Sequence, residues 1–114
     1  WIISASFEIQ DGWYITSNNP GLDFLVPTRF NAYVQDIYSV AGVRYPLSVD
    51  KQTPLGTMGI YENGTMITAN LKAQDTIPKQ NLRVILEFQT CSKDGECLPP
   101  AKIVAKGDDI IIEQ

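Results

Sequence analysis

The sequence of 114 residues contains no histidine, and this absence excludes several kinds of chemistry. Histidine is the general base of Ser–His–Asp triads and the commonest ligand of catalytic zinc. Only two cysteines are present, which is too few for a structural zinc site. We therefore expect neither a histidine-based triad nor a structural zinc site.

Long apolar runs, basic clusters and helical periodicity are missing as well. No apolar run approaches the ~20 residues that a membrane-spanning helix needs. The nine Lys and Arg residues are scattered, and the net charge of −4 argues against a nucleic-acid-binding surface. With 44% hydrophobic and 19% charged residues, the chain is expected to fold as a single globular domain over residues 1–114.

What the sequence does contain is a series of short alternating segments separated by turn formers. Asn63-Gly64 is the strongest hairpin signal, because both residues tolerate the positive φ of a type I′ turn. The segment 36–57 is irregular and is expected to form a long edge connection or a cap. Together these features predict an all-β sandwich. The expected strands are 3–9, 13–16, 29–35, 59–61, 66–69, 82–88, 101–105 and 110–112, the last two around a turn at Gly107-Asp108.

The two cysteines, Cys91 and Cys97, are separated by five residues. A strand ending at Cys91, a turn through Asp94-Gly95 and a return to Cys97 would bring the Cα atoms within the roughly 4.4–6.8 Å that a disulfide needs. Pro99-Pro100 stiffens the exit, since proline fixes φ and has no N–H to pair. The sequence thus predicts a rigidly framed dithiol or disulfide in a hairpin-like loop, in an oxidising compartment.

Two functions fit such a pair. A structural staple would stabilise a non-catalytic extracellular binding or adhesion sandwich by about 2 kcal/mol. Thiol–disulfide exchange instead needs a sulfur that another thiolate reaches. Strand alternation puts Cys91 on the side opposite the core row that ends at Phe88, unless a bulge shifts the register. Asp94 and Glu96 disfavour a thiolate, so no strongly acidified thiol is expected. The spacing leaves both functions open.

The run of residues 88–100 resembles the active-site segment of the N-terminal periplasmic domain of the DsbD thiol–disulfide interchange family. In both, an aromatic-Gln pair precedes the first cysteine, five residues intervene, and an apolar residue and Pro-Pro follow the second. Residues 11–15 are similar to the family's Asp-Gly-aromatic-aromatic strand. The resemblance implies an immunoglobulin-like sandwich in the periplasm, alone or as part of an inner-membrane protein, with Cys91 and Cys97 as its redox pair.

The resemblance also implies partners. A transmembrane reductase domain would reduce the pair, and thioredoxin-like periplasmic proteins would receive the electrons. Cys97 is the cysteine expected to form the mixed disulfide with a partner. Because the two sulfurs carry both electrons, the resemblance implies no organic cofactor or metal, no small-molecule substrate and a monomeric isolated domain.

A cap loop shields the cysteines in this family, and the matching stretch here is 52–55. This stretch lacks the acidic residues and the phenylalanine of the family's cap, and the tyrosines of the family's early strand correspond to Trp13 and Ile15. The resemblance therefore implies that Trp13, Ile15, Pro54 and Leu55 surround the pair, with Leu55 and Trp13 covering it.

Overall fold

The computed structural model describes residues 2–35, 37–72, 81–106 and 111–113. Its regular elements over these residues are strands, which confirms the all-β class predicted from the alternating segments. They are β1 (Ile2–Ser6), β2 (Trp13–Thr16), β3 (Arg29–Val34), β4 (Ile37–Tyr38), β5 (Val40–Arg44), β6 (Val49–Thr53), β7 (Gly56–Tyr61), β8 (Met66–Leu71), β9 (Leu82–Phe88), β10 (Thr90–Ser92), β11 (Ala101–Lys106) and β12 (Ile111–Glu113).

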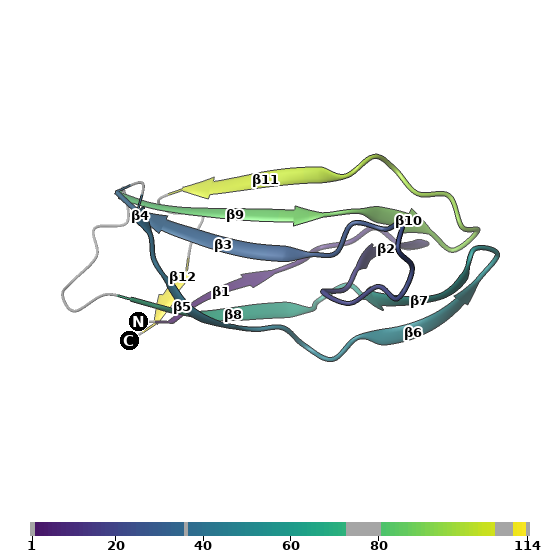
Figure 1. The fold of residues 1–114 in the computed structure, drawn as a ribbon, viewed down its shortest axis with the longest axis horizontal. Coiled ribbons are helices and arrows are strands. Elements are labelled where there is room, and N and C mark those ends of the chain that lie inside the picture. The colour runs from purple at the N-terminus through teal and green to yellow at the C-terminus, as the bar shows by residue number, and fades with distance from the viewer. Residues whose placement is uncertain (1, 36, 73–80, 107–110, 114) are drawn as a thin grey trace.

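The strands form three four-stranded antiparallel sheets. Sheet A has the order β12-β1-β8-β5, sheet B the order β10-β2-β7-β6, and sheet C the order β11-β9-β3-β4. Sheets A and C are the two layers of an elongated sandwich of 48 × 21 × 21 Å. Sheet B lies at one end of it, together with the β6–β7 hairpin and the loop after β10, whereas both termini are marked at the other end (Figure 1).

The main core lies between sheets A and C and explains the alternating patterns of the sequence. In β9 every second side chain is buried, as predicted. Each fully buried Leu, Ile or Phe side chain contributes roughly 1.5–3 kcal/mol. Facing rows from several strands complete this core, and two residues of sheet B close its end. The rows are Ile3 of β1, Phe30 and Ala32 of β3, Ile67, Ala69 and Leu71 of β8, and Leu82, Val84, Leu86 and Phe88 of β9, closed by Ile15 and Tyr61.

Two predictions about the chain's path are wrong. The segment 36–57, expected to be an irregular connection, contains strands β4, β5 and β6, each at an edge of its sheet. Asn63-Gly64 does form a turn, with Gly64 at a φ of 87°, but it joins β7 of sheet B to β8 of sheet A, which do not pair. Its backbone bonds instead go to the chain beyond β1, where the Gly64 amide donates to the Phe7 carbonyl (2.9 Å).

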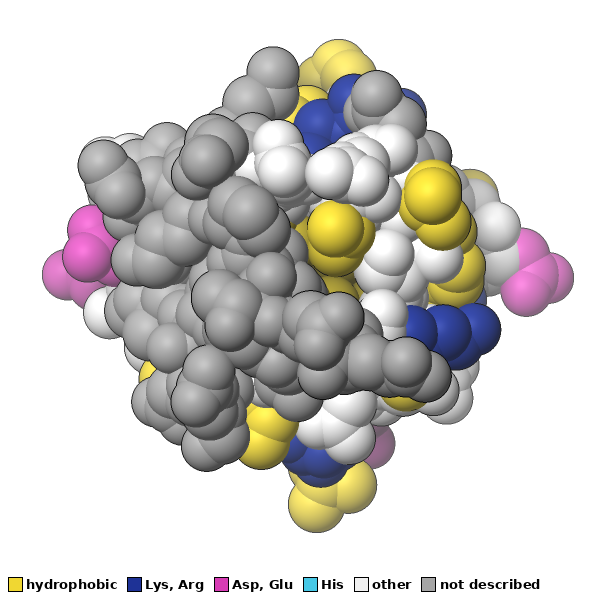
Figure 2. Space-filling model, turned by 90° about the vertical axis from the view of Figure 1, so that its left-hand side faces the viewer, with side chains coloured by type: hydrophobic (Ala, Val, Ile, Leu, Met, Phe, Trp, Pro, Cys, Tyr) yellow, Lys and Arg dark blue, Asp and Glu magenta, His cyan; other side chains and the backbone are white. Residues whose placement is uncertain are grey.

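At the end of the sandwich that carries the termini, the described surface side chains are of several kinds. Figure 2 faces this end and shows, among the described residues, isolated hydrophobic groups beside Lys and Arg side chains. Within the described residues, no helix has the length and apolar character that crossing a membrane requires. The predicted turn at Gly107-Asp108 and the start of the last predicted strand at Ile110 lie outside the described residues.

Candidate functional site

The two cysteines form a disulfide at the end of the sandwich opposite the termini. Their Cα atoms lie 4.0 Å apart, and the two residues also form a β-bridge. The loop between them closes as predicted: the Gly95 amide donates to the Ser92 carbonyl (3.1 Å), and the Ser92 amide donates to the Glu96 carbonyl (2.7 Å). Gly95 adopts a φ of 89°, a conformation that glycine takes without strain.

The first cysteine lies on the face of sheet B opposite the main core, as strand alternation predicts, but a second set of apolar side chains covers that face and buries it. Strand β9 ends in sheet C at Phe88, and the chain then crosses to sheet B, where β10 pairs with β2. The alternation continues through the crossing: Thr90 pairs with Ile15 and lines the same cavity as Phe88, so Cys91 lies on the opposite face. Cys91 is nevertheless only 1% exposed, whereas Cys97 is half-buried.

A second, smaller core surrounds the disulfide on the outer face of sheet B. Leu25, Met58 and Ile60 are buried with Cys91, and Tyr14, Leu22 and Cys97 pack against them. Leu22 and Leu25 come from the covering segment, as we call residues 18–26, which connects β2 to β3. This segment was not predicted as part of the site, because its many turn formers give no indication that the two leucines pack in the cluster around the cysteines.

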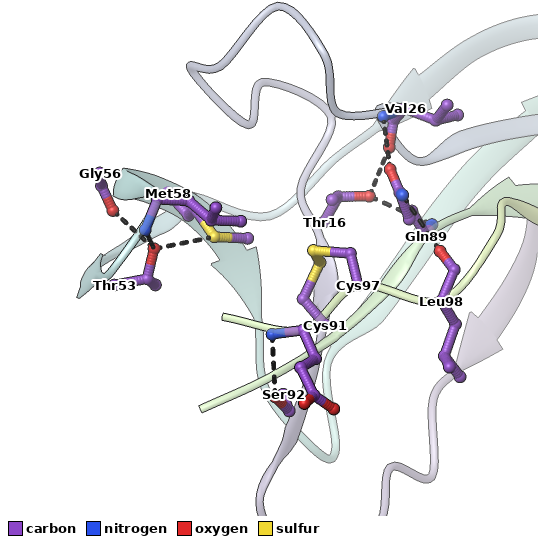
Figure 3. The surroundings of a disulfide bond; sticks show 12 residues. Thr16, Val26, Thr53, Gly56, Met58, Gln89, Cys91, Ser92, Cys97 and Leu98 are labelled. Carbon is purple, nitrogen blue, oxygen red and sulfur yellow. Dashed lines mark hydrogen bonds between the residues drawn. A yellow bond between two sulfur atoms is a disulfide. The ribbon is translucent and has the colours of Figure 1, made fainter. Parts of the chain in front are cut away.

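The predicted cap stretch is the tip of the β6–β7 hairpin, and it lies against the cysteine loop. Pro54 Cδ is 3.2 Å from the position that a Cβ on Gly95 would take. Thr53 Oγ1 donates to the Gly56 carbonyl (2.8 Å) and lies 3.4 Å from Met58 Sδ, which holds the tip beside the second core (Figure 3). Leu55 is 42% exposed. The position fits a cap, and the shielding role of Pro54 and Leu55 stays a prediction.

Trp13 and Ile15 lie on the other face of sheet B, so the expectation that they surround the cysteine pair is wrong. Across the β10–β2 ladder Ser92 faces Trp13 and Thr90 faces Ile15, while Cys91 faces Tyr14. Ile15 belongs to the main core, and Trp13 lines a cavity of about 600 Å³ between the sheets. A difference of one residue in register therefore makes Tyr14 the aromatic neighbour of the disulfide.

The Tyr14 ring in turn contacts a lysine of the neighbouring hairpin. Lys51 Nζ of β6 lies 5.7 Å from its ring centroid, within cation–π range. Farther along the sandwich Lys102 Nζ is 3.5 Å from Glu87 Oε1, across the β11–β9 pair. Lys102 is thus paired with a carboxylate. Within the described part of the chain, no three His, Cys, Asp or Glu side chains cluster as metal ligands.

Gln89, the residue at the crossing, joins three segments around the disulfide. Its Oε1 accepts from the Val26 amide (2.9 Å), and its Nε2 donates to the Leu98 carbonyl (3.1 Å). Its backbone carbonyl accepts from the Thr16 amide (2.9 Å), and Thr16 Oγ1 donates to the Val26 carbonyl (2.6 Å). The covering segment, β2 and the chain that leaves Cys97 therefore meet at one buried residue (Figure 3).

The start of the covering segment is anchored by Tyr61 of β7. The Tyr61 hydroxyl donates to Asn18 Oδ1 (2.9 Å) and accepts from the Asn18 amide (3.3 Å). Burial raises the pKa of the Tyr61 hydroxyl above its ordinary value of 10.0, although the Asn18 amide acts in the opposite direction. The neutral phenol is thus the form that the fold stabilises.

The raised pKa of Tyr61 predicts a loss of stability in alkali. The contribution of the neutral Tyr61 phenol to the free energy of unfolding is fully present below about pH 10, and it disappears as the pH rises through the raised pKa. A Tyr61→Phe variant lacks this group, so above about pH 10 the wild type should lose stability more steeply than the variant, by up to ~1.4 kcal/mol per pH unit. Urea denaturation between about pH 8 and pH 11 measures both curves. Parallel curves would contradict the assignment.

The comparisons with known proteins agree with this geometry. The family model described as "Thiol:disulfide interchange protein DsbD, N-terminal" matches residues 2–108. Among solved structures, the chain is similar to the reduced-form crystal structure of the Neisseria meningitidis DsbD n-terminal domain, with a TM-score of 0.61 and 14% identity over 99% of this chain and 90% of that one. At this identity the likeness shows the fold, and it confirms the immunoglobulin-like sandwich. No curated protein matches the chain.

Proposed function

The chain belongs to the family of DsbD N-terminal domains, and from this premise we propose that it is a periplasmic protein-disulfide reductase module. In this proposal the Cys91–Cys97 pair takes reducing equivalents from a membrane-embedded reductase domain and passes them to oxidised thioredoxin-like proteins. The observation that carries the proposal is the disulfide itself, which joins the chain's two cysteines at the end of the sandwich away from the termini.

The exchange needs only sulfur chemistry. A thiolate of the reductase attacks Cys97 Sγ, a new S–S bond forms between the proteins, and the Cys91–Cys97 bond breaks. Cys91 leaves with the electron pair and takes a proton. The second thiolate of the reductase then attacks the reductase's other cysteine sulfur, the one bonded to Cys97 in the mixed disulfide, and Cys97 is released and protonated. The domain gains two electrons and two protons, and the same steps in reverse reduce an oxidised partner.

Cys97 is the better candidate for the attacked sulfur because it is the less enclosed of the two. Cys91 is 1% exposed and lies among Leu25, Met58 and Ile60. Cys97 is half-buried and packs at the margin of that cluster. An incoming sulfur has to displace only side chains at the edge of the second core to reach Cys97, whereas reaching Cys91 would require opening the second core itself.

A redox titration tests the proposal. The isolated domain is equilibrated with glutathione or dithiothreitol buffers of known potential, and the fraction of free thiol is measured. We expect a reduction potential between about −120 and −270 mV, the range of proteins that exchange disulfides. A potential below about −300 mV would place the bridge among structural disulfides and reject the exchange function.

The burial of Cys91 supports a second candidate, a non-catalytic binding sandwich whose disulfide is a staple. A sulfur that is 1% exposed inside an apolar cluster is typical of a structural bridge. The small ring would still contribute about 2 kcal/mol to stability. The same titration separates the two candidates, because a staple should stay oxidised in buffers that reduce an exchange protein.

A further inference from the structure

We propose that Gln89 is a positioning residue that keeps the two cysteine-bearing arms together when the disulfide is open, and that it thereby sets the reduction potential of the pair. The inference rests on the proposed exchange function and adds a residue to that site. By arms we mean the chain that enters Cys91, residues 89–91, and the chain that leaves Cys97, residues 97–98.

The Gln89 side chain occupies a position where its amide has two fixed partners. Gln89 is only 9% exposed, although its side chain is polar. Its Nε2 donates to the Leu98 carbonyl of the other arm (3.1 Å), and its Oε1 accepts from the Val26 amide of the covering segment (2.9 Å). A buried amide that lost these bonds would leave polar atoms desolvated and unpaired, so the side chain is held in this orientation.

The hydrogen bond between Gln89 and Leu98 joins two residues that lie close in sequence to the two cysteines. Leu98 directly follows Cys97, and its amide donates to the Thr90 carbonyl (2.8 Å), directly before Cys91. Leu98 is thus bonded to the first arm through both its N–H and its carbonyl group. These bonds do not involve the sulfurs, so they persist when the S–S bond breaks and hold the Cys97 arm against the Cys91 arm.

The link affects the oxidised and reduced forms unequally. In the oxidised form the covalent bond restrains the Cys97 arm with or without Gln89. In the dithiol form only the bond from the Leu98 amide to the Thr90 carbonyl holds the arm once the Gln89 amide is lost, so the arm separates more easily and water satisfies the Leu98 carbonyl. Removal of the amide therefore favours the dithiol, lowers the effective concentration of one thiol at the other, and makes the domain more oxidising.

The test compares two substitutions of Gln89 with a matched control. Gln89→Met keeps the length of the side chain and removes both bonds, and Gln89→Glu keeps an oxygen for the Val26 amide but loses the donor to Leu98. We expect each to lower the equilibrium constant for disulfide formation about fivefold to tenfold, where tenfold corresponds to about 30 mV. Gln10→Met makes the same change at an exposed residue and should leave the constant within twofold of the wild type.

A second measurement needs no variant. In the reduced wild-type domain, hydrogen exchange at the Leu98 amide should remain within about tenfold of its rate in the oxidised domain, because the arm stays docked. Full loss of this protection on reduction would overturn the inference, and so would an unchanged equilibrium constant in a folded Gln89 variant. Either result could occur with a wild-type potential in the exchange range, so failure of the inference is distinct from failure of the proposed function.

Discussion

A Cys91→Ser domain is expected to react with a small disulfide reagent at least about tenfold faster than a Cys97→Ser domain, while neither variant transfers a pair of electrons. In the first variant the remaining thiol is Cys97, which is half-buried at the margin of the second core. In the second variant the remaining thiol is Cys91, which is 1% exposed. A thiol that reacts only after local opening is slowed tenfold for each ~1.4 kcal/mol of opening free energy.

Stopped-flow reaction with an aromatic disulfide under pseudo-first-order conditions measures both rates. Both variants also lose the staple, which costs about 2 kcal/mol, so circular dichroism must show that each is folded before the rates are compared. In about 6 M guanidinium chloride the two rates should converge, because burial no longer distinguishes the thiols. Equal rates in the folded state, or a faster Cys91, would remove the structural reason for choosing Cys97 as the attacked sulfur.

Much of the fold was predictable because its strands follow simple alternation. The row that ends at Phe88 is buried at every second residue, as the sequence indicated. The loop between Cys91 and Cys97 also follows from local signals, since Asp94-Gly95 supplies the turn and the short spacing brings the sulfurs together. Local turn chemistry and period-two patterns depend only on neighbours in sequence, and these are the features that a single sequence carries.

The surroundings of the sulfurs were not predictable because they depend on which segment covers the outer face of sheet B and on the register between β10 and β2. Cys91 lies off the main core, as alternation indicates, but the covering segment buries it, and the register of β10 on β2 makes Tyr14 its neighbour in place of Trp13. The hairpin predicted at Asn63-Gly64 was wrong because a local turn signal does not say whether the two strands it joins pair, and here they belong to different sheets. Alternation gives the sides of one strand, but neither the segment that covers each side nor the strand with which it pairs.

The cover over the disulfide depends on the absence of a side chain at Gly59 of β7. The Gly59 amide donates to the Pro20 carbonyl (2.9 Å), and its carbonyl accepts from the Ser17 amide (3.0 Å), so the covering segment starts directly on this strand. A Cβ on Gly59 would collide with the Asn19 carbonyl oxygen and with Ser48 Oγ. The first of these is backbone, which cannot rotate away, so the start of the covering segment would have to move.

Gly59→Ala is therefore expected to destabilise the domain by about 1–3 kcal/mol and to uncover the disulfide. Displacing the covering segment loosens Leu22 and Leu25 over the sulfurs, so reduction by dithiothreitol should accelerate about tenfold for each ~1.4 kcal/mol by which opening becomes easier. Urea denaturation of the oxidised domain and thiol release under limiting dithiothreitol measure the two effects.

Gly42→Ala is the matched control for this substitution. Gly42 is exposed on β5, and a Cβ there would meet nothing within 4 Å, so stability and reduction rate should stay close to those of the wild type. If Gly59→Ala accelerated reduction without loss of stability, local opening of the covering segment would be separable from the two cores. If it behaved like Gly42→Ala in both measurements, the covering segment would not be what limits access to Cys91 and Cys97, and the hairpin tip at Pro54 would remain as the barrier.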